Sequence, residues 1–96
     1  MNAVLIDELK DTVAVVTESV PAGTVVSFSS QKGEEKIIAK DDIPIYHKVA
    51  RCRISKAEEV IKYGEVIGLA AREIDPGEWV HEHNLICART VNGGKV

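Results

Sequence analysis

The chain has 96 residues, enough for one hydrophobic core but not for two, so we expect a single domain over residues 1–96. Fifteen acidic residues against twelve basic ones give a formal net charge of −3, which argues against a protein that binds the phosphate backbone of nucleic acids. The N-terminus lacks the pattern of a signal peptide, and no window approaches the ~20 apolar residues of a membrane span. We therefore expect a cytoplasmic protein without membrane contact.

Short runs rich in Val, Ile and Thr predict an all-β protein, because β-branched side chains pack well on a pleated sheet and lose freedom in a helix. The expected strands, in chain order, are TVAVVT (12–17), a short buried KIIAK (36–40), EVIGLAA (65–71) and LICART (85–90). Turn-forming sequences lie between them, at Pro-Ala-Gly (21–23), Lys-Gly-Glu (32–34) and Pro-Gly (76–77).

One segment has a competing helical pattern. In SKAEEVIKYGE (55–65), four residues have the spacing i, i+3, i+4, i+7: Ala57, Val60, Ile61 and Gly64. Such spacing places side chains on one face of a helix. Because two glycines follow closely, we expect at most one short helix here.

An internal repeat is more informative than propensity, because it shows one local solution used several times. An aliphatic residue is followed six positions later by valine in VPAGTVV (20–26), IPIYHKV (43–49), ISKAEEV (54–60) and IDPGEWV (74–80). The fourth residue of two units is a turn-forming glycine, Gly23 or Gly77. Each unit is predicted to be a strand end, a tight turn, and a valine that returns to the core. Four such units imply a compact all-β body with turns at its edges.

Two of the three histidines lie one residue apart in WVHEHN (79–84). In an extended segment Trp79, His81 and His83 point to one face, so both imidazoles can reach one point. The spacing H-x-H is typical of metal sites, but a catalytic zinc normally has three protein ligands. His47, in the second repeat unit, can supply the third if its turn faces that of the fourth unit. The residues alone leave open whether these histidines bind a metal, bind a substrate or are ordinary surface residues.

Several other residues have an ordinary structural interpretation. Trp79 is more typical of a core residue than of a stacking platform, and Lys48 is either a carboxylate ligand or a solvated lysine. Cys52 and Cys87 belong to no C-x-x-C pair, so we expect free core cysteines, as in a reducing compartment.

Three motifs occur in a fixed order: DDIPIYHKV (41–49), YGEVIG (63–68) and GEWVHEHN (77–84). From about Val13 to Leu85 the chain resembles the N-terminal SAF domain of the altronate and galactarate dehydratases, which is also found as a free small subunit. Ala57 departs from the family pattern, which has a glycine in that turn. The resemblance implies an all-β SAF-type β-clip, a small β-body with long, bent hairpins.

The resemblance also implies a function: a small subunit of a sugar-acid dehydratase that completes the active site of a separate large catalytic subunit. Eliminating water from an aldonate or aldarate needs a base, an acid and a cation that stabilises the developing charge. In this interpretation His47, His81 and His83 are catalytic, Lys48 and Asn84 bind substrate, and His81 and His83 are candidate metal ligands. The metal is expected to be divalent, Fe²⁺ or Mn²⁺, and to be held mainly by the partner chain.

Two alternatives stay open. The small subunit of (2R)-sulfolactate sulfo-lyase is also similar, and there sulfite leaves instead of water. SAF-like domains also occur as non-catalytic binding modules. In either case we expect the core within residues 13–90, a flexible tail over 91–96, and exposed β-edges that permit a homo-oligomer.

Overall fold

The computed structural model describes residues 1–5, 7 and 10–87. Within these residues the chain has nine strands and no helix, so none that could cross a membrane. The all-β prediction is confirmed. The strands are β1 (Ala3–Val4), β2 (Val13–Val16), β3 (Val25–Ser30), β4 (Gly33–Ile38), β5 (Lys48–Ala50), β6 (Glu59–Lys62), β7 (Glu65–Ala70), β8 (Trp79–Val80) and β9 (Leu85–Cys87).

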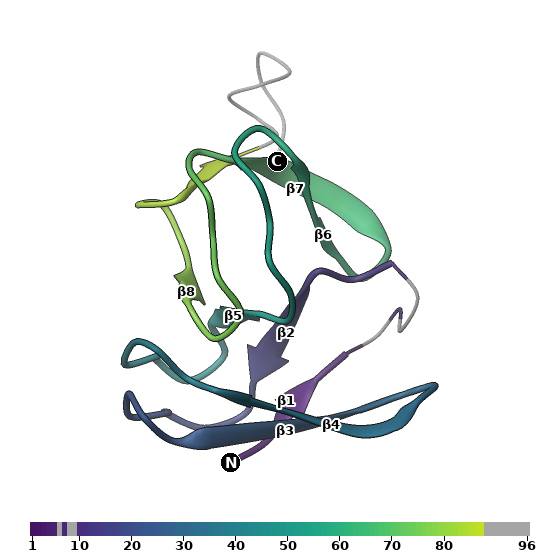
Figure 1. The fold of residues 1–96 in the computed structure, drawn as a ribbon, viewed down its shortest axis with the longest axis vertical. Coiled ribbons are helices and arrows are strands. Elements are labelled where there is room, and N and C mark those ends of the chain that lie inside the picture. The colour runs from purple at the N-terminus through teal and green to yellow at the C-terminus, as the bar shows by residue number, and fades with distance from the viewer. Residues whose placement is uncertain (6, 8–9, 88–96) are drawn as a thin grey trace.

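The strands form three small antiparallel sheets (Figure 1). A central sheet has the order β1-β2-β5-β8, and the long hairpin β3-β4 lies below it in the view of Figure 1. The third sheet, β6-β7-β9, lies above it. Long hairpins around a small body agree with the expected β-clip.

The four repeat units share one turn conformation. Their first and last aliphatic residues are all buried, as the repeat predicts. The fourth residue has a positive φ in every unit: Gly23 (88°), Tyr46 (66°), Ala57 (71°) and Gly77 (92°). The N–H of the fifth residue donates to the C=O of the second, for example from His47 to Pro44 at 3.0 Å. A hydrogen-bonded turn with positive φ at its third position is of type II, so the predicted repeat is confirmed.

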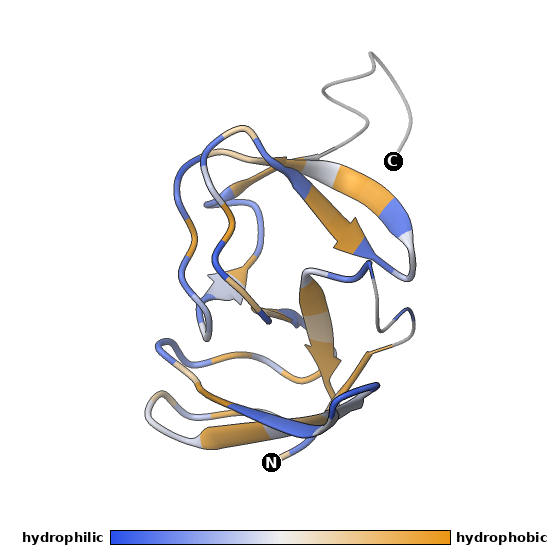
Figure 2. Ribbon diagram, turned by 45° about the vertical axis from the view of Figure 1, so that its right-hand side comes forward, coloured by the Kyte–Doolittle hydropathy of each residue, from blue (hydrophilic) through white to orange (hydrophobic). Residues whose placement is uncertain are grey.

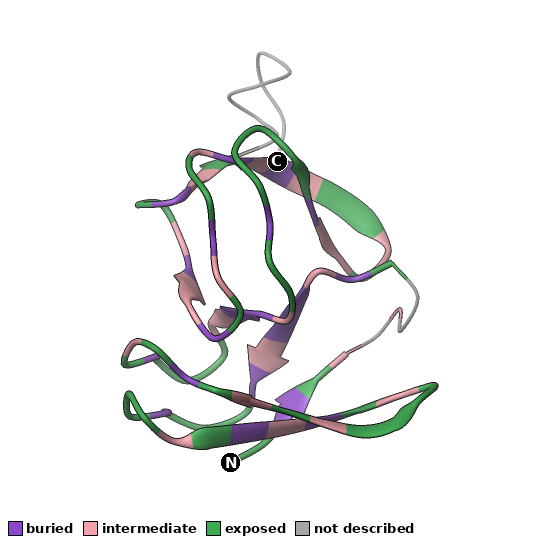
Figure 3. Ribbon diagram, in the orientation of Figure 1, coloured by how far each residue is buried: buried purple, intermediate pink, exposed green. Residues whose placement is uncertain are grey.

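The repeat units are joined in pairs, and their aliphatic residues pack in the core. Isolated bridges join Val20 to Ile43 and Ile54 to Ile74. Figure 3 shows a buried stretch in each of the long loops β5–β6 and β7–β8, which contain the second of these bridges. The turns therefore lie at the edges of the domain, while the aliphatic residues on either side of each turn are buried in its core.

Two core clusters lie on opposite faces of the central sheet. Neighbouring residues belong to different clusters, Val13 and Ala14 on β2 and Val49 and Ala50 on β5. Successive side chains of a strand point to opposite faces, which explains this division. Figure 2 shows β2 in the colour of hydrophobic residues, as expected for a strand covered on both faces.

The helical alternative for residues 55–65 is wrong. Ala57 occupies a turn, β6 follows, and Tyr63 and Gly64 form a two-residue hairpin loop with φ of 56° and 76°. Positive φ at both central positions is required by a type I′ hairpin turn. A shift of register between Val60 and Ile61 interrupts the alternation, and this irregularity imitates helical spacing.

The predicted strands are only partly right. The runs 12–17 and 65–71 correspond to β2 and β7 within a residue or two. The prediction of a buried strand over 36–40 is wrong. β4 starts earlier, pairs with β3 alone among the described strands, and leaves Ile38 62% exposed. In the run 85–90, β9 covers the first three residues and the rest lie outside the described residues.

Two further predictions concern cysteines and the tail. Cys52 is free, as expected, but it is exposed and therefore not a core residue. The side chain of Cys87 and the whole of the predicted tail, 91–96, lie outside the described residues.

Candidate functional site

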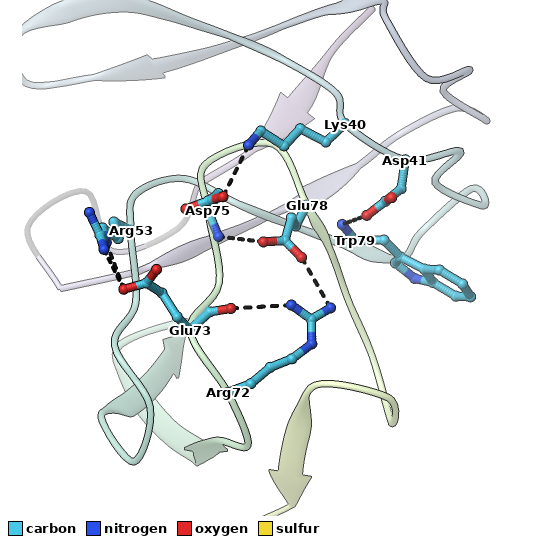
Figure 4. Close-up of polar contacts among 8 residues, drawn as sticks. All are labelled: Lys40, Asp41, Arg53, Arg72, Glu73, Asp75, Glu78 and Trp79. Atoms are coloured by element: carbon cyan, nitrogen blue, oxygen red, sulfur yellow. Dashed lines mark hydrogen bonds and ion pairs between the residues drawn. The ribbon is translucent and has the colours of Figure 1, made fainter.

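Trp79 is the centre of the candidate site. It lies on β8 opposite Val49 of β5, and its indole is partly buried against one of the two core clusters. Its backbone N–H donates to Oδ2 of Asp41 at 3.0 Å (Figure 4), and its C=O accepts from Nδ2 of Asn84 at 2.9 Å. The indole is therefore fixed both by its backbone and by the core.

The four residues after β8 form a turn. The side chain of Asn84 is fully buried, and its Oδ1 accepts a hydrogen bond from the N–H of His81 at 2.9 Å. The N–H of Asn84 donates to the C=O of His81 at 3.1 Å. The prediction of an extended segment from Trp79 to His83 is therefore wrong, because Asn84 closes a tight turn. Its amide is committed to the backbone in this conformation and positions the loop, while substrate contact by Asn84 stays a prediction.

The turn nevertheless brings the imidazoles together on the indole. His81 stacks on Trp79, with ring centroids 5.2 Å apart and planes 9° apart. The ring of His83 lies 5.1 Å from Trp79 and is tilted by 47°. His47 lies 4.9 Å from His81 and 5.7 Å from Trp79. The expectation that the turn of the second repeat unit faces that of the fourth is confirmed by these distances.

His47 differs from the other two histidines. Its Nδ1 accepts a hydrogen bond from Nε1 of Trp79 at 3.1 Å. Burial, and then the charges of His81 and Lys48, lower the pKa of His47 from its ordinary value, so its imidazole is neutral at pH 7. The rings of His81 and His83 make no hydrogen bond to any residue that the structure describes.

Lys48 follows His47 at the start of β5. It pairs with Val15 of β2 and Val80 of β8, so the central sheet holds its backbone. Its side chain is partly buried, and its positive charge acts on the pKa of His47. Binding of a substrate carboxylate by Lys48 stays a prediction.

An open depression of about 570 Å³ lies beside the rings. It is lined by Asp41, Asp42, Arg72, Glu78, Trp79, His81, Glu82 and His83. Four carboxylates and a single guanidinium make its wall acidic. Sites for small molecules bury most of the ligand surface, and this open wall supplies only one side of such a site.

Arg72 is held at the rim of the depression by a polar network (Figure 4). Its guanidinium pairs with Oε1 of Glu78 at 3.2 Å and donates to the C=O of Glu73 at 3.2 Å. The other oxygen of Glu78 accepts from the N–H of Asp75 at 2.6 Å, and Asp75 in turn pairs with Lys40 at 3.0 Å. The guanidinium is therefore oriented although its side chain is 52% exposed.

The described histidines and carboxylates do not hold a metal on their own. Among residues 1–5, 7 and 10–87, no group of three or more His, Cys, Asp or Glu side chains is arranged to do so. Nδ1 of His47 already accepts a hydrogen bond, which leaves His81 and His83. Two histidines fall short of the three protein ligands of a catalytic zinc, so the described residues supply at most part of a ligand set for a divalent ion.

Sequence reasoning missed part of the site. It assigned Trp79 to the core, and the indole does pack there, but it also carries the rings of both neighbouring histidines. A signal was present, because alternation along β8 places Trp79 on the face opposite the buried Val80. No sequence pattern marks Arg72, whose position depends on its pairing with Glu78.

Comparison with known proteins identifies the family. The family described as "Altronate/galactarate dehydratase SAF domain" matches residues 1–88. The chain belongs to this family. The match includes all three motifs and every ring of the histidine cluster, so the resemblance expected from the motifs is confirmed.

Named relatives of this SAF domain fall into two groups. Subunit alpha of (2R)-sulfolactate sulfo-lyase from Chromohalobacter salexigens is 40% identical over 73 residues, which cover 74% of this chain and 78% of the relative. Altronate dehydratase of Escherichia coli is 39% identical over 74 residues, covering 77% of this chain but 14% of the relative. Galactarate dehydratase (L-threo-forming) of Escherichia coli is 46% identical over 46 residues, covering 48% and 9%. The SAF domain thus spans most of one lyase subunit and a small part of the dehydratases, and its family is one of lyases.

Proposed function

We propose that this SAF domain is the small subunit of a sugar-acid dehydratase and completes the active site of a separate large catalytic subunit. The observation that carries the proposal is the cluster of three imidazoles on Trp79, in a family described by its altronate and galactarate dehydratases. Eliminating water from an aldonate or aldarate requires removal of a weakly acidic proton beside a carboxylate and protonation of the leaving hydroxide. Imidazoles with unengaged ring nitrogens suit both steps, and His81 and His83 have them.

The character of the depression supports a two-chain site. It is open, and Asp41, Asp42, Glu78 and Glu82 make its wall acidic. A sugar acid is an anion, so this wall alone repels it, and Arg72 is already paired with Glu78. The opposing wall and the positive charge for the carboxylate therefore come from the large subunit. In the dehydratase relatives the matched region is 14% or less of the chain, so most of each chain lies outside it, which supports a large partner for this SAF domain.

A divalent metal, Fe²⁺ or Mn²⁺, is the expected cofactor and is held mainly by the large subunit. Such an ion stabilises the negative charge that develops when the proton beside the carboxylate is removed. On the small-subunit side, His81 and His83 are expected to contact substrate oxygens and move protons. Lys48 does not line the depression, so its expected contact with the carboxylate is secondary to the charge that the large subunit supplies. Asn84 keeps the histidine loop in position.

Reconstitution tests the proposal. Elimination is measured on altronate and galactarate with this chain alone, the large subunit alone, and the mixture with added Fe²⁺ or Mn²⁺. Activity is expected only in the mixture, and His81→Ala or His83→Ala is expected to lower it at least 100-fold. Glu59→Ala, at an exposed position on β6 that does not line the depression, is the control and keeps most of the activity. Near-normal turnover with both histidine variants contradicts the proposal.

A second candidate is the small subunit of a (2R)-sulfolactate sulfo-lyase. It is favoured by the extent of the match, because the aligned region covers 78% of that subunit in Chromohalobacter salexigens. The same mixtures, supplied with (2R)-sulfolactate and followed by sulfite release, separate the two. Turnover of neither substrate class, with no co-elution of the chains, favours a non-catalytic binding module.

A further inference from the structure

We propose that Trp79 is a positioning residue that fixes the tautomer of His47, and that His47 acts as a neutral hydrogen-bond donor through Nε2. This inference concerns the roles within the histidine cluster, and its catalytic part rests on the proposed function. It separates His47 from His81 and His83, which sequence reasoning placed in one group.

The hydrogen bond between the two rings determines the tautomer. Nε1 of Trp79 and Nδ1 of His47 are 3.1 Å apart. An indole nitrogen is only a donor, so Nδ1 of the imidazole must be the unprotonated acceptor. In a neutral imidazole the single proton is then on Nε2.

Trp79 is built to hold this geometry. Its backbone is fixed by Asp41 and Asn84 on either side, and its ring packs against the core. The imidazole of His81 stacks nearly parallel to the indole of Trp79, and the imidazole of His47 lies against the same indole. The indole N–H therefore cannot turn away without disturbing the strand, the loop and the core together.

The tautomer limits what His47 can do. A general base or a metal ligand needs an unprotonated ring nitrogen, and the one on His47 is occupied by Trp79. Nε2 has no hydrogen-bond partner among the residues that the structure describes, and the side chain is partly exposed. His47 can therefore donate to an oxygen of a bound anion, as oxyanion-stabilising groups do. Proton transfer is left to His81 and His83.

Nuclear magnetic resonance on the ¹⁵N-labelled chain alone tests the tautomer. Long-range ¹H–¹⁵N spectra at neutral pH are expected to show His47 protonated at Nε2 and unprotonated at Nδ1. A scalar coupling across the hydrogen bond is expected between Nε1 of Trp79 and Nδ1 of His47. A proton on Nδ1, or an indole N–H that exchanges as fast as that of an exposed tryptophan, overturns the proposal.

Trp79→Phe removes the donor but keeps an aromatic ring. Both tautomers of His47 are expected to become populated in this variant, while Glu82→Gln, the matched control, leaves the spectrum of His47 unchanged. A spectrum of His47 that stays the same in Trp79→Phe overturns the positioning role. If the variant does not fold, the wild-type coupling and tautomer still decide the question.

Activity of the assembled enzyme tests the donor role. His47→Gln places an amide N–H near the position of Nε2, so it is expected to retain at least tenfold more activity than His47→Ala. Equal loss in both variants overturns the donor role. If no mixture of the two chains turns over a sugar acid or sulfolactate, the proposed function fails, but the spectra of the isolated chain still report on the tautomer.

Discussion

Asn84→Ala is the most direct test of how the histidine loop is held. Asn84 is fully buried, and its amide makes two hydrogen bonds to the backbone, to Trp79 at 2.9 Å and from His81 at 2.9 Å. A side-chain hydrogen bond contributes about 0.5–1.5 kcal/mol, and a buried polar group left without a partner costs about 1–3 kcal/mol. Water can reach the partly exposed loop once it loosens, so the loss is expected to be about 2–3 kcal/mol. For a domain of this size that corresponds to a fall in Tm of roughly 8–24 °C.

Asn84→Asp separates hydrogen bonding from packing. The aspartate is nearly isosteric and keeps the acceptor for the N–H of His81, but it places a carboxylate oxygen against the C=O of Trp79. Burying a charge beside a like partial charge is unfavourable, so Asn84→Asp is expected to be at least as destabilising as Asn84→Ala at pH 7. If packing alone mattered, Asn84→Asp would stay close to the wild type.

Urea unfolding followed by far-UV circular dichroism measures these changes. Fluorescence of Trp79, the single tryptophan of the chain, reports on the loop itself. Glu82→Ala, in the same turn but exposed, is the control and is expected to lie within about 0.5 kcal/mol of the wild type. An Asn84→Ala variant as stable as Glu82→Ala, with unchanged fluorescence, refutes the assigned role.

Three further variants test the turns and the pH dependence. Ala57→Gly is expected to raise the free energy of unfolding by about 0.5–1 kcal/mol in urea, because relief of a left-handed conformation (φ 71°) exceeds the entropic cost of glycine. Gly77→Ala is expected to lower it by about 3 kcal/mol or more, since a Cβ would lie 2.1 Å from the carbonyl oxygen of Ile38 at a φ of 92°. The lowered pKa of His47 means that the unfolded chain binds its proton first as the pH falls. The contribution of neutral His47 to the free energy of unfolding is therefore complete above about pH 6.5 and is lost as the pH drops through the folded-state pKa. His47→Gln is expected to reduce this dependence of the free energy of unfolding on pH, measured by urea unfolding at several pH values.

Local patterns in the sequence predict the turns and much of the sheet. The spacing from an aliphatic residue to a valine identifies four turns that share a conformation, because a tight turn depends on nearby residues and its apolar flanks mark where the chain enters the core. The failures come from pairing between distant segments. Ile38 looks like a core residue, yet β4 pairs only with β3 and leaves it exposed. The irregular register at Val60 and Ile61 gives a helical spacing that only the partner strand reveals.

The candidate site is predictable in its residues but not in its roles. The motifs identify His47, His81 and His83, and the equivalent turns correctly suggest that they meet. Whether a ring nitrogen is free depends on one hydrogen bond between strands, from Trp79 to His47, which no local pattern specifies. The hydrogen bonds by which the amide of Asn84 closes the histidine loop are likewise not marked by any local pattern.

The repeat also explains why a histidine can stand at position 47. In the fourth unit the fifth residue, Glu78, accepts from the N–H of the second, Asp75, and Glu58 closes the third unit in the same way. His47 occupies this fifth position in the second unit, where the second residue is Pro44. Proline has no N–H to satisfy, so a side chain that closes the turn is not needed there. The imidazole of His47 is therefore not needed to close its turn, which is closed by the backbone hydrogen bond from His47 to Pro44. Its ring can instead accept the hydrogen bond from the indole of Trp79.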